Sequence, residues 1–385
     1  MESNPFAHAI NIPPSIGIED LNAMLRHMVE LGGSDLFLMG GSQAWIQLNS
    51  RMVRITRREL SDQEIFQVLM HNDIYGANAP SRLGGKDPIN TSHEFVVKDG
   101  AERTRYRFRV NAVGCLRRGR QSVTMTLRTI PTVPPTAAAL GIEADILRVA
   151  RGADQGLILV TGATGNGKST LLGSLIRDQL EAVDGNRNVV TIEAPIEFVY
   201  DDVEKASSFI TQMEVDKHIN DFHEGVKNAM RMAPTTILIG EARDYETVSS
   251  ALEASVTGHV VYSTVHTNSV PETFQRLVGV YPESLQLQAR LDILQALKMV
   301  ITQRLIPTVD GKRTAIREYL VLDQAIKDRL AAASNLTRES FAILREFGRP
   351  MAEDAREKFA AGVISQETLD RQLLNYDAGG DHGAS

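Results

Sequence analysis

The sequence has a single cysteine, Cys115, among its 385 residues. A lone cysteine excludes a disulfide within the chain, and it excludes metal centres built from several thiolates. Such sparing use of cysteine is typical of proteins from a reducing compartment.

Positive charge is also in short supply. Lysine and arginine total 41 against 48 aspartates and glutamates, which gives a formal net charge of -7 and a pI near 5.8. A general nucleic-acid-binding protein usually carries a basic domain. The charge balance therefore disfavours that class of protein and leaves only a local basic patch open.

Long apolar runs are missing as well. None approaches the roughly 20 residues that a helix needs to cross a bilayer. The opening MESNPFAHAINIPPS lacks the basic segment and apolar core of a secretory signal. We therefore expect a cytoplasmic protein whose only contact with a membrane is peripheral.

The chain divides by composition into parts of different character. Its 385 residues, 43% of them hydrophobic, allow two or three domains with sizeable cores. Three closely spaced prolines in PTVPPTAAALG suit an extended linker. We expect a flexible N-terminus over 1–15, an α+β domain over 16–130, the linker over 131–141, an α/β domain with a helical C-terminal part over 142–375, and a disordered tail over 376–385.

The local patterns differ on the two sides of the linker. Before it, SDLFLM and AWIQLN predict strands, GIEDLNAMLRHMVELGGS predicts an amphipathic helix, and Ser61 with Glu64 forms a capping box at the start of another. After it, helical segments separate four continuous apolar runs, GLILVTG, NVVTIEAP, TTILIGEA and HVVYSTVH. This alternation predicts a parallel sheet covered on both faces. From about Ile316 the pattern is mostly helical.

The segment GATGNGKST carries the sharpest motif. It fills the pattern G-x-x-x-x-G-K-[ST] between an apolar strand and a helical pattern. Such a loop directs backbone N–H groups at phosphate oxygens beside a helix N-terminus. Lys168 would reach the β- and γ-phosphates of ATP, and Ser169 would ligate Mg²⁺. The predicted nucleotide-binding residues are Gly162, Ala163, Thr164, Gly165, Asn166, Gly167, Lys168, Ser169 and Thr170.

Hydrolysis also needs an acid near the γ-phosphate. Glu241 follows the apolar run of TTILIGEARD, and Glu193 ends the run of VVTIEAPIEFVY, with Glu197 shortly after it. The carboxyl end of a strand faces the crevice where open α/β sheets bind ligands. We expect Glu241 and Glu193 to orient the metal or the attacking water; the alternative for each is a solvated acid at a strand end.

The segment RTRYRFRVN alternates with a period of two. In a strand, Arg103, Arg105, Arg107 and Arg109 would share one face. That face is open to three interpretations: a solvated surface, a contact with a nucleic-acid backbone, or arginine fingers offered to nucleotide phosphates across an interface. We favour the third for Arg107 and Arg109.

Two histidines flank the apolar run of TGHVVYSTVHTNS. His259 and His266 are seven residues apart. Seven strand residues span roughly 23 Å, and an odd offset turns the two side chains to opposite faces. They therefore cannot share a metal ion. His266 ends the strand at the crevice, whereas His259 stands at the opposite end, where structural packing is favoured.

The motifs together resemble those of the PilT-like secretion and type IV pilus ATPases. GATGNGKST, TIEAPIEFVY, ILIGEARDYET and TGHVVYSTVHTNS stand in the order of that group's Walker A, Asp box, Walker B and His box, and GGSDLFLMGG and RYRFRVNAV are similar to its N-terminal segments. The resemblance covers about residues 20–375. It implies a hexameric ring in which a PAS-like domain precedes a RecA-like ATPase core, with nucleotide between the two, arginines reaching it from the N-terminal side, and His266 sensing the γ-phosphate.

Three positions depart from the common pattern. Ala194 replaces the aspartate of E-D-P, Ala233 replaces that of R-x-D-P, and Phe37 replaces the histidine of SDLHL. The two alanines are more similar to DotB of type IVB (Dot/Icm) secretion systems and to its conjugation relative TraJ than to pilus retraction motors. Because the Asp box lacks its aspartate, the expected role rests on Glu193.

The resemblance therefore implies a cytoplasmic homohexamer that hydrolyses MgATP to power a type IVB secretion or conjugative apparatus. Its partners would be inner-membrane components of that apparatus, with peripheral membrane association and no direct binding of nucleic acid. The alternatives are a pilus retraction motor, a RecA-like nucleic-acid translocase, and a nucleotide-gated assembly scaffold with negligible turnover.

Overall fold

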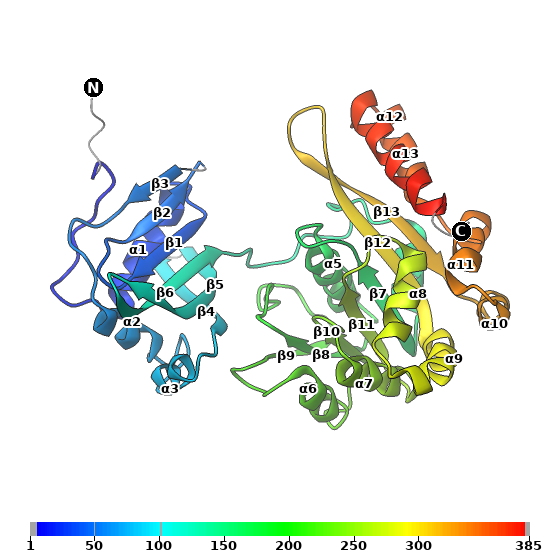
Figure 1. The fold of residues 1–385 in the computed structure, drawn as a ribbon, viewed down its shortest axis with the longest axis horizontal. Helices are drawn as coiled ribbons and strands as arrows, with labels where there is room; N and C mark the ends of the chain where they lie inside the picture. Colours follow the sequence, from blue (N-terminus) through cyan, green and yellow to red (C-terminus); the bar gives the residue numbers. More distant parts are fainter. Residues whose placement is uncertain (1–5, 50, 101, 382–385) are drawn as a thin grey trace. The chain divides into compact units, whose positions relative to one another are not determined.

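The chain forms two compact units (Figure 1). The computed structural model describes residues 6–49, 51–100 and 102–381. The first unit runs to Val133 and also contains two later segments, Ala194–Val199 and Glu214–His218. The second unit contains the remaining residues from Pro134 onward. Most of the predicted linker over 131–141 therefore belongs to the second unit.

The first unit is built on an antiparallel sheet of order β3-β2-β1-β6-β5-β4. Its elements are α1 (Ile18–Glu30), β1 (Asp35–Met39), β2 (Trp45–Leu48), β3 (Arg51–Arg54), α2 (Asp62–Leu69), α3 (Ala79–Gly84), β4 (Ile89–Asp99), β5 (Glu102–Arg117) and β6 (Arg120–Thr129). Alternate strand residues such as Leu36, Leu38 and Val110 are fully buried in one core with Leu21 and Leu25 of α1. This α+β arrangement agrees with the one predicted.

The capping box predicted at the start of α2 is present in the first unit. The Ser61 hydroxyl accepts from the N–H of Glu64 (3.3 Å), and the Glu64 carboxylate accepts from the N–H of Ser61 (2.8 Å), which confirms the capping box. Ile10 donates its N–H to the carbonyl of Ile55 (2.9 Å), and Ile10 and Ile12 pack against the core. The flexibility predicted for 1–15 thus does not extend to this stretch; residues 1–5 lie outside the described residues.

The second unit is built on a sheet of order β13-β12-β7-β11-β10-β8-β9. Its strands are β7 (Gly156–Thr161), β8 (Asn188–Glu193), β9 (Phe209–Glu214), β10 (Thr236–Ile239), β11 (Val260–Val265), β12 (Leu297–Pro307) and β13 (Arg313–Val321). Neighbours from β12 to β8 pair in parallel, and β13 pairs antiparallel to β12. The four apolar runs are the parallel strands β7, β8, β10 and β11. Both β7 and β11 are buried along their whole length, as a doubly covered sheet requires.

Helices account for most of the rest of the second unit. They are α4 (Ala144–Gly152), α5 (Lys168–Glu181), α6 (Phe222–Ala229), α7 (Tyr245–Val256), α8 (Val270–Gly279), the 3₁₀ turn η1 (Glu283–Leu285), α9 (Gln286–Ala296), α10 (Gln324–Ala332), α11 (Leu336–Phe347), α12 (Met351–Ala360) and α13 (Gln366–Asp381). Within the described residues, no helix combines the length and the apolar character needed to cross a membrane.

The C-terminal region is mostly helical from Gln324 onward, as predicted, and the structure departs from the prediction at two points. The helical pattern predicted from Ile316 begins inside β13, because the fully buried Ile316 and Leu320 lie four residues apart and imitate a helical repeat. The disordered tail predicted over 376–385 is instead helical up to Asp381, as the last part of α13. Residues 382–385 of that tail lie outside the described residues.

Strand β5 carries the arginine alternation, but its charged face is not uniformly open. Arg107 is 2% exposed, and its guanidinium donates to the carboxylate of Glu94 (3.0 Å) and to the carbonyls of Ile196 (2.9 Å) and Glu197 (2.8 Å). Arg109 on the same strand is exposed. Because the donors of Arg107 are engaged within its own unit, Arg107 anchors the segment Ala194–Val199, and the arginine-finger role predicted for it would require these bonds to break.

The segment Glu214–His218 is attached to the first unit by the buried carboxylate of Glu214. Glu214, 1% exposed, accepts hydrogen bonds from the hydroxyls of Thr91 (2.9 Å) and Ser92 (2.7 Å). It also accepts from the backbone N–H groups of Ser92 (3.0 Å) and Ile196 (3.2 Å). A buried carboxylate is tolerated when its lone pairs are filled in this way. Arg107 and Glu214 together hold both late segments on the first unit.

Replacing Arg107 with alanine should destabilise the first unit. The change leaves the carbonyls of Ile196 and Glu197 without a charged donor, which should cost about 2–4 kcal/mol of unfolding free energy. Denaturant unfolding of Arg107→Ala against the parent measures it. Arg103→Ala, on the exposed start of the same strand, is the matched control. Equal unfolding of the two variants would contradict the anchoring role.

Candidate nucleotide-binding and catalytic site

The register of the parallel strands places their carboxyl ends side by side. Thr161 at the end of β7 pairs with Val265 at the end of β11. Ile239 at the end of β10 pairs with Ser263 of β11 on one side and with Ile192 of β8 on the other. Neighbouring strands lie roughly 4.8 Å apart. The segments that follow these four strands therefore emerge along one edge of the sheet.

That edge gathers the residues predicted for catalysis in the second unit. In strand order across the sheet, the phosphate loop begins at Gly162, His266 follows β11, Glu241 follows β10, and Glu193 ends β8. The four motifs lie far apart in sequence but converge here. Open α/β sheets bind their ligands at this edge.

The phosphate loop has the curled backbone that its glycines permit. Gly162, Gly165 and Gly167 have φ values of 145°, 81° and 74°. Residues other than glycine rarely adopt this backbone region. A Cβ atom on Gly162 would also lie 2.4 Å from the carbonyl oxygen of Gln303. Helix α5 begins at Lys168 directly after the loop, so its free N–H groups lie at the loop.

The side chains of the loop are placed for a phosphate ligand. The buried Lys168 donates from Nζ to the carbonyls of Gly162 (2.9 Å) and Ala163 (3.3 Å), which holds its positive charge across the loop. Ser169 and Thr170 are half-buried on the first turn of α5. The remaining predicted positions, Ala163, Thr164, Gly165, Asn166 and Gly167, are exposed or half-buried.

Glu241 and His266 form a pair that neither motif predicts alone. Glu241 Oε1 lies 3.6 Å from His266 Nε2, and both side chains are partly exposed, at 32% and 45%. The Thr264 hydroxyl donates to the carbonyl of Gly240 (2.6 Å), and the N–H of Ala242 donates to the carbonyl of Thr264 (3.0 Å). These bonds fix the ends of β10 and β11 to each other. An acid and an imidazole thus lie together at this edge of the sheet.

Glu193 has its own partners at the neighbouring strand end. Its Oε1 accepts from the hydroxyl of Thr191 (2.7 Å) and from the side-chain amide of Gln212 (3.3 Å). The sequence patterns did not point to either partner. Thr191 could have been found, because residues i and i+2 of a strand share a face. Gln212 lies on β9, whose place beside β8 is not visible in the sequence.

His259 lies away from this edge, at the start of β11. Its Nδ1 contacts the carbonyl of Ala254 (3.0 Å) and the Thr257 hydroxyl (3.4 Å), so it joins the end of α7 to the strand. The whole of β11 separates it from His266. With the strand between them, the two histidines lie too far apart to bind one metal ion, and His259 contacts the end of α7.

Known proteins match this chain over most of its length. Residues 15–371 match the family described as "Type II/IV secretion system protein". The type IV pilus retraction ATPase PilT of Pseudomonas aeruginosa is 34% identical over 361 residues, which are 94% of this chain and 95% of PilT.

Two solved structures are similar over nearly their whole length. The ATPase DotB of Legionella pneumophila has a TM-score of 0.87 and 39% identity, covering 95% of this chain and 98% of DotB. The pilus retraction motor PilT with bound ADP has a TM-score of 0.74 and 28% identity, covering 92% and 96%. The chain therefore belongs to the type II/IV secretion system protein family, and it is an ATPase of the secretion and pilus type.

Proposed function

We propose that this ATPase powers a type IVB secretion or conjugative apparatus as a hexameric ring at the cytoplasmic face of the inner membrane. The observation that carries the proposal is the likeness to DotB, with a TM-score of 0.87 at 39% identity against 0.74 at 28% for the PilT structure. The alanines at positions 194 and 233 support the same branch. Its partners are membrane components of that apparatus.

A pilus retraction motor is the second candidate. It is favoured by the 34% identity to PilT of Pseudomonas aeruginosa over 95% of that protein. Both candidates share the chemistry of the site and differ in the machine that the motor drives, so a cellular experiment separates them.

In the proposed reaction, the loop from Gly162 to Thr170 holds the phosphates of ATP. The Lys168 ammonium turns from the loop carbonyls to the β- and γ-phosphate oxygens. Glu241 holds the water that attacks the γ-phosphorus as the bond to ADP breaks. His266 lies 3.6 Å from Glu241 and contacts the γ-phosphate. Because His266 directly follows β11, release of the γ-phosphate is sensed at the end of that strand. Glu193 is the second acid at the same edge.

The donor set at this edge fits Mg²⁺. The Ser169 hydroxyl on the first turn of α5 and the carboxylates of Glu241 and Glu193 are hard oxygen ligands, the type that Mg²⁺ prefers beside nucleotide phosphates. Bound there, the ion would neutralise phosphate charge, and Ser169 is the residue that would hold it.

Removing the proposed acid should separate binding from turnover. Glu241→Gln keeps the shape of the side chain but cannot act as a base, so ATP hydrolysis should fall by about 100-fold or more while ATP still binds. Phosphate release and equilibrium nucleotide titration measure the two effects. Glu246→Gln on the exposed start of α7 is the control. Parent-like turnover in Glu241→Gln would move the role to Glu193.

Arg109 should act on the site of a neighbouring subunit. Its exposed side chain on β5 makes it the more accessible of the two arginines predicted as fingers that stabilise charge on the γ-phosphate. Arg109→Ala and Lys168→Ala should each be inactive alone. When they are mixed, some interfaces pair an intact loop with an intact arginine, so ATPase activity should reappear. If the mixture stays inactive while each protein still assembles, action across the interface is refuted.

Deleting the gene from its host should abolish type IVB protein or DNA transfer and leave pilus-driven surface motility intact. The parent gene should restore transfer, whereas a gene encoding Glu241→Gln should not, because the apparatus needs turnover. Transfer counts and motility zones measure the two outcomes. Loss of motility with normal transfer would favour the retraction motor.

A further inference from the structure

The buried side chain of Gln303 on β12 hydrogen-bonds to the backbone of the phosphate loop. Gln303 is 3% exposed, and its Nε2 donates to the carbonyl oxygens of Asn166 (2.8 Å) and Gly167 (3.0 Å). The preceding residue, Thr302, pairs with Thr161 of β7, and their hydroxyl oxygens lie 2.8 Å apart. Gln303 therefore lies beside the point where the loop leaves its strand.

Holding these two carbonyls determines where two backbone donors point. In a planar trans peptide, the C=O of one residue and the N–H of the next point in opposite directions. With the carbonyls of Asn166 and Gly167 turned toward Gln303, the N–H groups of Gly167 and Lys168 are turned away from it, into the loop. Those are the donors that a phosphate at the start of α5 would meet.

The orientation of the Gln303 amide is set by a second residue. Arg317 of β13 stands directly opposite Gln303 in the antiparallel register, and its Nε donates to Gln303 Oε1 (2.8 Å). A guanidinium has donors and no acceptor. The oxygen of the amide must therefore face Arg317, and its NH₂ group must face the loop.

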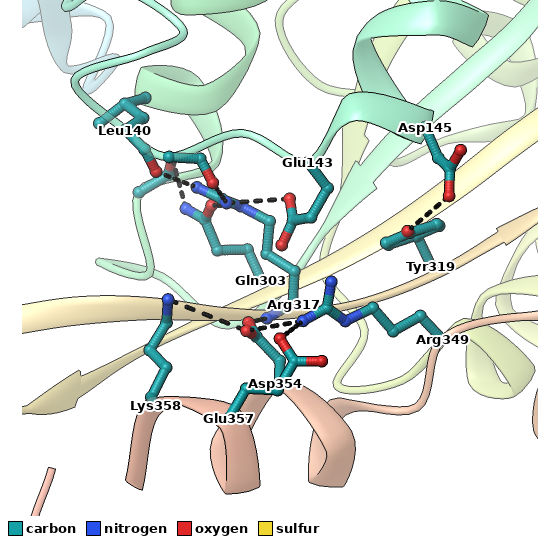
Figure 2. A network of polar contacts seen from close by, with 12 residues as sticks. Leu140, Glu143, Asp145, Gln303, Arg317, Tyr319, Arg349, Asp354, Glu357 and Lys358 are labelled. Carbon is teal, nitrogen blue, oxygen red and sulfur yellow. Dashed lines mark hydrogen bonds and ion pairs between the residues drawn. The ribbon is translucent and has the colours of Figure 1, made fainter. Parts of the chain in front are cut away.

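Arg317 is itself fixed on several sides, as Figure 2 shows. It is 2% exposed. Its Nη1 donates to the carbonyl of Gly141 (3.1 Å) and to the carboxylate of Glu143 (3.0 Å), and its Nη2 donates to the carbonyl of Leu140 (3.2 Å). Its backbone N–H donates to the carboxylate of Asp354 on α12 (2.8 Å). With so many bonds, the guanidinium cannot turn away from Gln303 without leaving buried groups unpaired.

We propose that Gln303 is a positioning residue for the nucleotide site. It orients two backbone N–H donors of the phosphate loop toward the nucleotide phosphates, and Arg317 keeps its amide in the working orientation. The inference rests on the proposed phosphate site at this loop. A residue that only filled space here would need the shape of glutamine but not its NH₂ group, and that difference is testable.

The test replaces the NH₂ group alone. Gln303→Glu keeps the shape and the acceptor for Arg317, but it sets a carboxylate oxygen against the carbonyls of Asn166 and Gly167, which turns their peptides. The Kd for ADP should rise by about tenfold or more, since two oriented donors are lost. The unfolding midpoint without nucleotide should stay within about 3 °C of the parent, while the rise that ADP produces should shrink.

A matched control is available in Gln372 of α13, which bonds to Arg304, the residue after Gln303 on β12. Gln372, 8% exposed, accepts from Nη1 of Arg304 (2.8 Å) and does not bond to the loop. Gln372→Glu repeats the chemistry of the substitution and should change the Kd for ADP by less than about twofold. Gln303→Met removes the donor without adding charge, and it should also weaken ADP binding.

The outcomes separate this inference from the nucleotide site on which it rests. Folded Gln303→Glu and Gln303→Met proteins that bind ADP like the parent would overturn the positioning role. Equal weakening in Gln303→Glu and Gln372→Glu would also overturn it, because the effect would then be general. Parent-like ADP binding in Lys168→Ala would instead count against the phosphate site itself.

Discussion

Parallel pairing between β7, β11, β10 and β8 is the constraint on which the candidate site depends. Each strand ends in a different motif, and only pairing in this order and register puts the motifs on one edge. The pairing also explains why the strands lack alternation, since helices cover both faces. A shift of two residues in one strand would move its catalytic side chain by roughly 7 Å, beyond the reach of a hydrogen bond.

The parts of this arrangement that the sequence predicts are those encoded locally. The loop from Gly162 is recognisable because glycine, lysine and serine must stand at fixed spacing, and Glu241 and His266 because each directly follows an apolar run. The 3.6 Å approach of Glu241 to His266 is not local, because it needs the neighbouring places of β10 and β11 in the sheet. The strand β13 was missed because the spacing of its buried residues also fits a helix.

Arg107 shows a different limit of pattern reasoning. Alternation correctly predicts that β5 is a strand and that its arginines share a side. It cannot predict that residues about ninety positions later would cover one of them, since Ile196 and Glu197 carry no signal of where they pack. A charged residue on the outer face of a strand is thus free only if no later segment returns to it, as the exposed Arg109 shows by contrast.

Two adjacent residues of strand β13 contact two different parts of the site, the support of the phosphate loop and the segment that follows His266. Arg317 points to Gln303 and thereby to the phosphate loop. Glu318, next to it and facing the other side of the sheet, accepts from the N–H of Val270 (2.6 Å), where α8 begins four residues after His266. Burial raises the pKa of Glu318 to about 7, against the bonds that favour its charged form. Because neighbouring residues of one strand hold the loop on one face and the segment after His266 on the other, β13 cannot shift without disturbing both. The strand that local patterns identified least well is therefore the one that ties the phosphate-binding part of the site to its catalytic edge.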